Sequence, residues 1–563
     1  MNPRTMMIRV ISCSILSVLG ALLAEGSSTA AVAFDWFEYT GRDALFETPL
    51  PPGHYRNPIL AGFHPDPSIC RVGEDYYLIN STFAYFPGIP VFHSRDLVHW
   101  TQIGHVIDRP TQLNYDGLGV SRGIFAPAIS HHAGIFYVVC TMVDGGGNFL
   151  VTATNPAGPW SDPVWYDFEG IDPSLFFDND GRAWLVNNGA PEGKPLYEGH
   201  RAIWIQEFEP TTRKLVGPRA VLVNGGVDLA KKPIWIEGPH LFKRGGWYYL
   251  SCAEGGTEYF HSQVIFRSKS PTGPFAPWDK NPILTQRDLA GDVPQAVIAT
   301  GHADMVIGPD SSWWSVFLGC RPYAGKFYNT GRETFMLPVT WTDDGWPQIL
   351  PPGVRVPYVI PSPRVGRVVP EAPPDLQPFT GNFTWRDEFA GSVLSPEWVM
   401  LRQPHENWWK LAGGRLELTP RSAALSGLNN PTFLGRRLQH ARFSATTRLA
   451  VPAAAGVSAG LVVFQNETHH YFLGVRRTVE GVRVFVEKWN GPQAEESAST
   501  IAAGVVSVEL RVTGEDQDCT FAFATEPGHW IGLGGKADAS VLSTQIGGGF
   551  VGAMVGLHAR LEP

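Results

Sequence analysis

One short motif recurs five times in the first 350 residues and constrains the fold more than any other feature. Each copy begins with a small or acidic residue, continues with Pro or a polar residue and an apolar pair, and leads through a turn to an aromatic-rich segment. The step from the second residue of the opening to the aromatic residue is 10, 10, 11, 10 and 10 residues. The openings and the segments that follow them are Asp66–Ile69 and Tyr76–Leu78, Ala126–Ile129 and Phe136–Val138, Asp172–Leu175 and Ala183–Leu185, Gly238–Leu241 and Tyr248–Leu250, and Ala303–Val306 and Trp313–Ser315.

This near-constant spacing predicts a strand, a tight turn and a returning strand in every copy. Turn-forming residues separate the two segments, as in Arg71–Asp75 and Lys243–Gly246. Repeats of roughly 45 to 65 residues with three or four short strands each are typical of propeller blades. The five copies therefore predict a five-bladed β-propeller. A series of separate β-sandwiches is the alternative, but it would lack the regular opening.

Composition supports an all-β fold and narrows the choice of partner. With Gly 61, Pro 47 and 12% aromatic residues among 563, the chain is too rich in turn formers for a helical bundle and too apolar for disorder. The formal net charge of -9 argues against nucleic acid and anionic membrane as partners, because both require a basic surface. We expect a neutral carbohydrate, an oligosaccharide or polysaccharide, whose C–H faces stack on aromatic rings and whose hydroxyl groups pair with carboxylates.

The N-terminus has the pattern of a secretory signal. Arg4 and Arg9 precede the apolar run Val10–Ala24, and the small-x-small pattern Ala31–Ala33 follows, which predicts a signal peptide over residues 1–33. A signal anchor is the alternative. No later stretch approaches about 20 apolar residues, so we expect a secreted, extracellular protein with no membrane contact after signal removal.

The cysteines and the glycosylation sequons constrain the fold less than the repeat does. The five cysteines that follow the predicted signal have no paired spacing, which argues against a disulfide framework or a zinc site and favours small core residues. Three sequons agree with secretion and a glycoprotein, although such sequences also occur by chance. The cysteines are Cys70, Cys140, Cys252, Cys320 and Cys519, and the sequons begin at Asn80, Asn382 and Asn466.

A proline-rich stretch divides the chain. Residues 351–378 hold nine prolines in 28 residues, which predicts a stiff linker without regular structure that wraps the first domain. From Phe379 the sequence changes to alternating strands separated by turn signals, typical of an antiparallel β-sandwich. The predicted domains are therefore a propeller over residues 34–350, the linker over 351–378 and a sandwich over 379–563.

Three acidic residues occupy equivalent places in the repeat. Asp66 and Asp172 stand at blade openings, and Glu237 immediately precedes Gly238-Pro239. Because the innermost strands of a propeller line a central funnel, we expect all three side chains in one pocket. The alternative for each aspartate alone is a turn residue, since Asp-Pro often opens turns.

Such a set of carboxyl groups fits cleavage of a glycosidic bond. One carboxylic acid protonates the departing oxygen, and a carboxylate on the opposite face activates water or attacks directly. A third carboxylate near the acid would disfavour its ionisation and keep it protonated near neutral pH.

The segments around these acids resemble glycoside hydrolase family 43, the β-xylosidases and α-L-arabinofuranosidases. The resemblance covers about residues 55–350, and the C-terminal part is similar to the concanavalin-like sandwich of the family's xylosidases. It implies a five-bladed propeller and an inverting mechanism, with Asp66 as general base, Glu237 as general acid, and Asp172 as the residue that orients the acid and raises its pKa. The segments that carry it are Asn57–Ile69, Gly170–Phe176 and Trp235–His240.

The same resemblance implies roles for four further residues. Phe83 and Phe125 would wall the sugar site, with core packing as the alternative for Phe83; Phe125 stands where many family xylosidases have Trp, and Ala128 replaces an Asp. His302 would lie on the propeller axis and, as in some members, help hold a water-bound structural calcium, with a core histidine as the alternative. Arg332 would bind sugar hydroxyls near the acid, with a surface salt bridge as the alternative.

The sequence thus predicts a secreted, inverting exo-glycosidase that removes terminal β-1,4-xylosyl residues from xylo-oligosaccharides and requires no cofactor. An α-L-arabinofuranosidase, or an enzyme with both activities, is the alternative, and a sandwich that caps the pocket would favour exo action. The alternative from another class is a non-catalytic carbohydrate-binding propeller, which would need no pair of acid and base.

Overall fold

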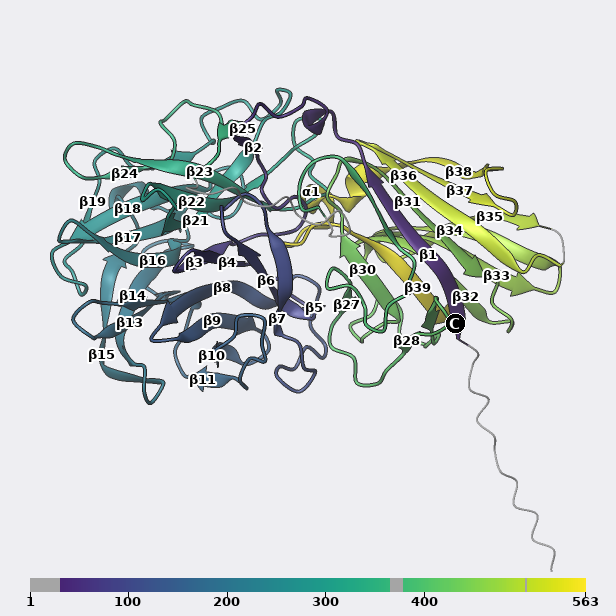
Figure 1. Ribbon diagram of the computed structural model, residues 1–563, viewed down its shortest axis with the longest axis horizontal. Coiled ribbons are helices and arrows are strands. Elements are labelled where there is room, and N and C mark those ends of the chain that lie inside the picture. Colours follow the sequence, from purple (N-terminus) through teal and green to yellow (C-terminus); the bar gives the residue numbers. More distant parts are fainter. Residues whose placement is uncertain (1–30, 365–377, 502–503, 563) are drawn as a thin grey trace, which may run out of the picture.

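The computed structural model describes residues 31–364, 378–501 and 504–562, and nearly all of its regular structure is β-strand. It has two parts, a five-bladed propeller and a β-sandwich that packs against one side of it (Figure 1). The predicted all-β fold is confirmed. Within these residues, helix is confined to the short α1 (Thr544–Gly547) and to 3-10 turns at Ala44–Phe46, Leu229–Lys231 and Ala539–Leu542.

Each blade is an antiparallel sheet whose first strand lies nearest the propeller axis. The fourth blade carries an additional short strand, β20 (Leu284–Thr285), beside β18. The blade strands are β3 (Ser68–Val72), β4 (Asp75–Ile79), β6 (Gly88–Ser94) and β7 (Thr101–Ile107); β8 (Gly123–His132), β9 (Ile135–Val143), β10 (Gly147–Ala153) and β11 (Val164–Tyr166); β12 (Ile171–Phe177), β13 (Ala183–Gly189), β14 (Ala202–Glu209) and β15 (Lys214–Asn224); β16 (Glu237–Arg244), β17 (Trp247–Glu254), β18 (Ser262–Ser268) and β19 (Ala276–Pro277); and β21 (Ile298–Ile307), β22 (Trp313–Cys320), β23 (Glu333–Trp341) and β24 (Pro347–Gln348).

The ring closes between the first and the fifth blade. The innermost strands β3, β8, β12, β16 and β21 contact one another in this order, and β21 contacts β3 in turn. The buried carboxylate of Asp304 on β21 accepts hydrogen bonds from the Ser68 hydroxyl at 2.9 Å and from the Ile69 amide at 3.0 Å. Outside the inner ring, Ile59 donates its amide to the carbonyl of Thr334 on β23 at 2.9 Å.

Four of the five innermost strands carry a bulge at the repeated opening. The pairing shifts between Phe125 and Ala128 on β8, between Ile171 and Ser174 on β12, and between Glu237 and His240 on β16. On β21 it shifts on both sides of Gly301. Proline lacks an amide hydrogen and a bulge leaves one residue unpaired, so the Pro of the opening fits there. A bulge also turns side chains away from the sheet, which explains why the openings face the central cavity.

The sandwich consists of two eight-stranded antiparallel sheets, which confirms the predicted architecture. Two of their strands come from the first part of the chain: β1 joins one sheet and β5 the other. The first sheet contains β28 (Trp409–Leu411), β29 (Leu416–Leu418), β1 (Val32–Gly41), β31 (Arg442–Ala450), β36 (Ser507–Glu515), β37 (Asp518–Ala524) and β38 (Ile531–Asp538), with β26 (Phe383–Asp387) beside β1; the second contains β35 (Ala494–Ile501), β34 (Gly481–Asn490), β33 (His469–Thr478), β32 (Val457–Asn466), β39 (Met554–Leu561), β30 (Phe433–Arg437), β27 (Val399–Leu401) and β5 (Tyr85–Phe86).

Two predicted boundaries need correction. The propeller does not begin at residue 34, because β1 pairs with β29 and β31 of the sandwich and buries Phe34 and Phe37 in its core. The segment 351–378 is not wholly irregular: β25 (Val359–Pro361) pairs with β2 (His54–Arg56) on the propeller. Residues 365–377 of the predicted linker lie outside the described residues.

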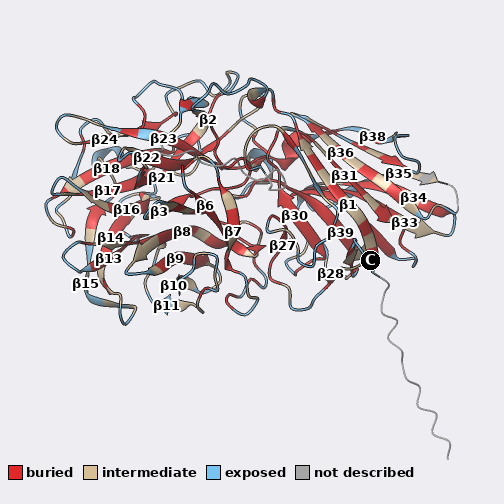
Figure 2. Cartoon of the chain, viewed as in Figure 1, coloured by how far each residue is buried: buried red, intermediate tan, exposed pale blue. Residues whose placement is uncertain are grey.

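The two parts share a sheet and a buried ion pair. Strand β5, between β4 and β6 of the first blade, pairs with β27 of the sandwich. Next to it, the fully buried Arg402 donates to the Leu118 carbonyl of the propeller and to the carboxylate of Glu467, which also accepts the amide of Val120 at 2.9 Å. Buried residues run along the strands of both parts (Figure 2).

Most of the described cysteines are core residues, as predicted, and one sequon is excluded. The five described cysteines are free, and all except Cys70 are buried. Asn80 is completely buried and donates its side-chain amide to the Pro65 carbonyl at 2.9 Å, so the folded protein cannot be modified there. The predicted signal peptide lies outside the described residues except for residues 31–33, and secretion stays a prediction.

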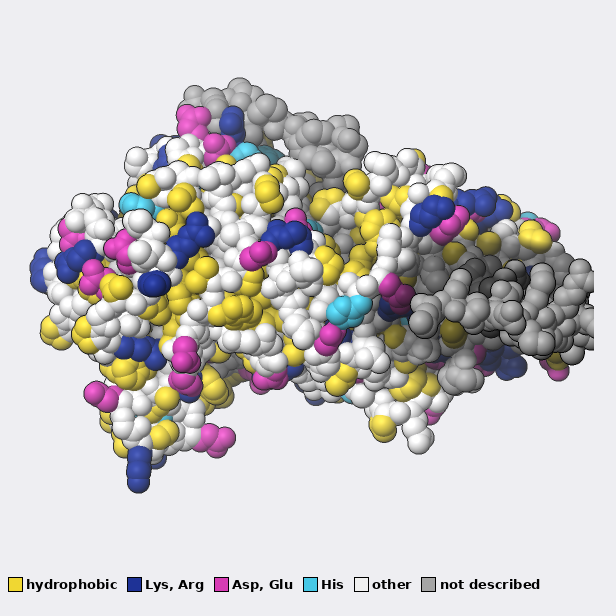
Figure 3. Space-filling model, turned by 90° about the horizontal axis from the view of Figure 1, so that it is seen from below, with side chains coloured by type: hydrophobic (Ala, Val, Ile, Leu, Met, Phe, Trp, Pro, Cys, Tyr) yellow, Lys and Arg dark blue, Asp and Glu magenta, His cyan; other side chains and the backbone are white. Residues whose placement is uncertain are grey.

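Charges of both signs are mixed on one face of the molecule. On the face shown in Figure 3, Lys and Arg side chains are interspersed with Asp and Glu. In the described part of the chain, none of the helices has the length and apolarity needed to cross a bilayer.

Replacing Arg402 by Met should destabilise the protein strongly. The change leaves the Glu467 carboxylate and the carbonyls of Leu118 and Asn429 without their charged donor, and breaking one partner of a buried ion pair costs about 3–5 kcal/mol. Urea unfolding measures the loss. The matched control is Lys410→Met, which removes an exposed pair with Glu417 at 3.8 Å and should cost less than about 1 kcal/mol. Equal losses in the two variants would contradict the interpretation of this interface.

Candidate active site

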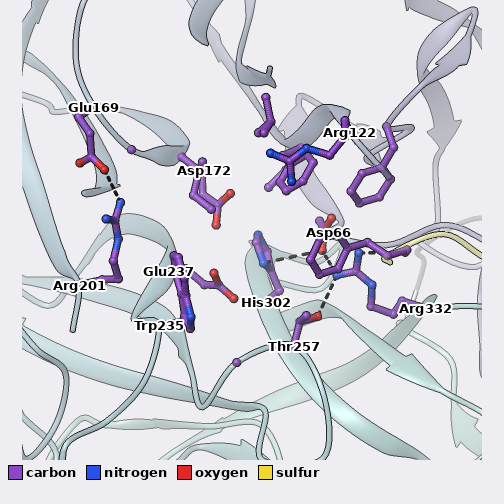
Figure 4. A pocket seen from close by; sticks show the side chains of 18 residues that line it. Asp66, Arg122, Glu169, Asp172, Arg201, Trp235, Glu237, Thr257, His302 and Arg332 are labelled. Carbon is purple, nitrogen blue, oxygen red and sulfur yellow. Dashed lines mark hydrogen bonds and ion pairs between the residues drawn. The ribbon is translucent and has the colours of Figure 1, made fainter. Parts of the chain in front are cut away.

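One pocket of about 650 Å³ opens at the mouth of the propeller, where the bulged openings meet. Asp66, Asp172 and Glu237, the three acids expected to share a cavity, all line it (Figure 4). The other four predicted site residues line it as well: Phe83, Phe125, His302 and Arg332.

The backbone around the pocket is strained. Five lining residues other than glycine have φ between 50° and 54°, a left-handed conformation that non-glycine residues seldom adopt. Such strain costs of the order of 1–3 kcal/mol per residue and tends to cluster at functional sites, where the surrounding structure holds it. The five are Asp66, Phe83, Asp172, Trp235 and His302.

Asp66 is held as a carboxylate. It accepts hydrogen bonds from the Ser81 hydroxyl at 2.6 Å and from the Arg332 guanidinium at 3.0 Å. Burial alone would raise the pKa of Asp66, but Arg332, with His302 and Ser81, outweighs this effect and holds the pKa below its usual value. An ionised carboxylate in this position can accept a proton from water.

Glu237 is held as a carboxylic acid. Burial raises the pKa of Glu237 well above its usual range, and the negative charges of Asp172 and Asp66 raise it further. Burial and the charge of Asp66 raise the pKa of Asp172 to about 7. Asp172 also accepts the amide of Gly238 at 3.0 Å, which ties its carboxylate to the residue that follows Glu237.

The site therefore separates two protonation states within one cavity. Asp66 has a guanidinium partner and a lowered pKa, whereas Glu237 lies with Asp172 and has a raised pKa. Pairs of carboxyl groups whose pKa values are driven apart provide the acid and the base of glycosidic bond cleavage. Near neutral pH, this arrangement can donate a proton from Glu237 and accept one at Asp66.

Arg332 is buried, with 8% of its surface exposed, so the surface salt bridge considered as its alternative is wrong. It bonds Asp66, the Thr257 hydroxyl at 3.0 Å and the Phe550 carbonyl at 3.2 Å. Its neighbour Glu333 binds Arg321 and the amide of Gly62. Arg332 and Glu333 therefore tie the fifth blade to Asp66 and to the segment that precedes it.

Three aromatic rings form one wall of the pocket. Phe83 and Phe125 meet edge to face with centroids 4.9 Å apart, and Phe550 of the sandwich stacks on Phe83 at 6.0 Å. Phe83 also packs in the propeller core. The same ring therefore lines the pocket and contributes to the core. Phe550 is anchored by its amide, which donates to the Ser121 hydroxyl at 2.9 Å. The sandwich thus closes one side of the cavity.

His302 lies between Asp66 and Gly238. Its Nδ1 is 3.8 Å from an Asp66 oxygen, and burial lowers the pKa of His302 to about 4, so the ring is neutral near pH 7. A Cβ on Gly238 would come within 2.9 Å of the ring, which explains the glycine after Glu237.

Calcium at His302 stays a prediction. The described residues contain no group of three or more His, Cys, Asp or Glu side chains that could hold a metal ion. The nearest carboxylate, Asp66, already binds the Arg332 guanidinium. These residues do not fit a directly bound cation.

Sequence reasoning missed several residues that line the pocket. Phe550 follows three glycines in the second domain, and no local pattern connects it with a propeller site. Trp235 stands two residues before Glu237, and its place in that motif was the available signal. Arg122, Glu169, Arg201 and Thr257 lie in loops with no distinctive sequence.

Two family models match most of the chain. Residues 55–347 match the family model described as glycosyl hydrolases family 43, and residues 386–561 match the β-xylosidase C-terminal concanavalin A-like domain. The chain is 39% identical to a xylosidase/arabinosidase from Butyrivibrio fibrisolvens over 89% of its own length and 95% of the relative's.

Two further comparisons extend over most of the chain. It is 37% identical to a non-reducing end α-L-arabinofuranosidase from Bacteroides ovatus, over 90% of its own length and 91% of the relative's. Its fold matches the crystal structure of a GH43_12 protein retrieved from a capybara gut metagenome, with a TM-score of 0.89 and 41% identity over 94% of this chain and 100% of the other. The chain belongs to glycosyl hydrolase family 43.

Proposed function

We propose that this chain is a secreted, inverting exo-glycosidase that releases single pentose units from the non-reducing ends of plant-type oligosaccharides. The leading substrate is a β-1,4-linked xylo-oligosaccharide, and α-L-arabinofuranosides are the second candidate. The supporting observation is the set of three carboxyl groups in one pocket, with the pKa of Asp66 lowered and that of Glu237 raised.

Each carboxyl group has a distinct part in the proposed reaction. Asp66 takes a proton from water as the water attacks the anomeric carbon, and Glu237 gives its proton to the departing glycosidic oxygen. The charge of Asp172 adds to burial in raising the pKa of Glu237, and the hydrogen bond from the Gly238 amide fixes the Asp172 carboxylate beside the acid. Attack by water opposite the leaving group inverts the anomeric configuration.

Exo action is supported by the shape of the pocket. Phe550 reaches in from the sandwich and packs on Phe83, which bounds the cavity beside Asp66 and Arg332. A single terminal sugar fits between this wall and Glu237 better than the interior of a long chain does.

The choice of pentose is open to a direct test. One relative is named a xylosidase/arabinosidase and another a non-reducing end α-L-arabinofuranosidase, and Phe125 is a smaller ring than the Trp of many family xylosidases. With aryl β-xyloside and aryl α-L-arabinofuranoside that share one leaving group, we expect the higher kcat/KM for the xyloside. A higher value for the arabinofuranoside would establish the second candidate, and no release from either would refute the pentosidase proposal.

Conservative changes at the two acids should abolish most activity. Glu237→Gln and Asp66→Asn should each lower kcat/KM on xylobiose by about 10²–10⁴-fold, because each removes one proton transfer. Asp343→Asn, an exposed change in a turn of the fifth blade, is the matched control and should keep the parent rate. Circular dichroism checks that the variants are folded, and parent-like rates in either variant would refute its assigned role.

The pH profile should report the role of Asp172. In the parent, kcat/KM falls at low pH as Asp66 gains a proton and at high pH as Glu237 loses one. Asp172→Asn removes a negative charge that raises the pKa of Glu237, so the alkaline limb should move to lower pH by on the order of one unit. An unchanged alkaline limb, or one moved to higher pH, would show that Asp172 does not act on the acid in this way.

A further inference from the structure

Trp235 is an exposed ring held in a strained conformation at the rim of the pocket. Trp235 is 41% exposed, and among the described residues only Trp165 is a tryptophan of comparable exposure. Its backbone has φ 51° and is fixed on both sides: the Trp235 amide donates to the Gly199 carbonyl at 2.9 Å, and Gly255 donates to the carbonyl of Ile234 at 2.9 Å. The protein thus maintains a costly conformation that keeps an aromatic ring in contact with the cavity.

The neighbouring loop leaves room for this ring. Gly199 has φ 79°, and a Cβ there would lie 2.0 Å from the Ile234 side chain and 3.6 Å from the Trp235 ring. Only glycine permits this approach. The loop that contains Gly199 therefore packs closely against residues 234 and 235, which lead into the next blade.

Arg201 lies against the same ring and is rigidly held. Its guanidinium carbon is 5.3 Å from the centroid of the Trp235 ring. Nε and Nη2 donate to the Asn188 side chain at 3.1 and 3.0 Å, and Nη2 also binds Glu169 at 2.8 Å. Within the described residues, Nη1 donates no hydrogen bond, so a donor beside the cavity is available to a ligand.

The same network is attached to the strand that carries Glu237. Asn188 is completely buried, and its side-chain amide donates to the carbonyl of Ile236, the residue between Trp235 and Glu237. Figure 4 shows Trp235 and Arg201 on the Glu237 side of the cavity, opposite Asp66 and Arg332. The ring and the guanidinium are thus fixed relative to the acid.

The direction of the reaction decides what this side of the pocket holds. The acid donates its proton to the oxygen that departs, while the base activates water on the opposite face of the sugar. The terminal sugar lies between Asp66 and Glu237, so the group that leaves must extend past Glu237. Trp235 and Arg201 occupy that position.

We propose that Trp235 and Arg201 form the subsite for the leaving sugar, a neutral pyranose that stacks on the exposed indole and accepts a hydrogen bond from Arg201 Nη1. This inference rests on the proposed function and adds to it a preference for leaving groups that contain a sugar ring. A leaving group with a sugar ring is bound by this subsite, whereas a leaving group without one is not.

Two donors with the same xylosyl group separate the subsite from the catalytic centre. Xylobiose places a pyranose in the subsite, whereas β-D-xylopyranosyl fluoride places only a fluoride ion there. Trp235→Ala should lower kcat/KM on xylobiose about 10- to 100-fold more than on the fluoride, the range expected for loss of one apolar contact in a pocket. Trp235→Tyr keeps a ring at the same backbone position and should recover most of the activity on xylobiose.

The matched control is Trp165→Ala, which removes another exposed tryptophan, 43% exposed, on β11 and outside the pocket lining. Trp165→Ala should leave kcat/KM unchanged on both donors. Equal losses on both donors for Trp235→Ala, or no loss on either, would overturn the subsite. A parent enzyme that is inactive on both xylosyl fluoride and α-L-arabinofuranosyl fluoride would refute the proposed function, and the subsite with it. That result differs from failure of the subsite alone, in which the parent enzyme is active and Trp235→Ala lowers kcat/KM equally on the two xylosyl donors or on neither.

Discussion

The burial of three carboxyl groups beside a single bonded guanidinium is the constraint on which the site depends. Buried charge is unfavourable unless it is paired and hydrogen-bonded, and of the three carboxyl groups Arg332 bonds that of Asp66. Asp66 can therefore stay ionised, and its charge works against ionisation of Asp172 and Glu237. The location of one arginine thus assigns the base to one side of the cavity and the acid to the other.

The propeller provides this arrangement through its bulges. An undistorted inner strand would point alternate residues into the space between blades, whereas the shifted pairing at the openings of β12 and β16 turns Asp172 and Glu237 toward the axis. The positive φ of Asp66 and Asp172 is the associated local cost. Closure of the ring by Asp304, Ser68 and Ile69 keeps these strands in place.

The sandwich is part of the same structural unit. The chain enters it in β1, leaves for the propeller, contributes β5 to its second sheet and returns after the linker. The loop that carries Phe550 approaches the propeller so closely that a Cβ on Gly331 would lie 2.7 Å from Gly552. This close approach of two glycines lets an aromatic residue of one domain close the pocket of the other and bind Arg332 through its carbonyl.

The sequence by itself was sufficient for the blades, the sandwich and the candidate acids, because a strand–turn–strand unit and its Asp-Pro or Glu-Gly-Pro opening are local patterns. It misplaced β1, since an isolated alternating strand carries no mark of the sheet that it will join, and it missed Phe550, Trp235 and Arg201. Only the tertiary structure decided these, because bulges, left-handed backbone and contacts between domains set the direction of a side chain. The protonation states of Asp66 and Glu237 were decided in the same way, since pKa values depend on burial and on charges that are distant in sequence and close in space.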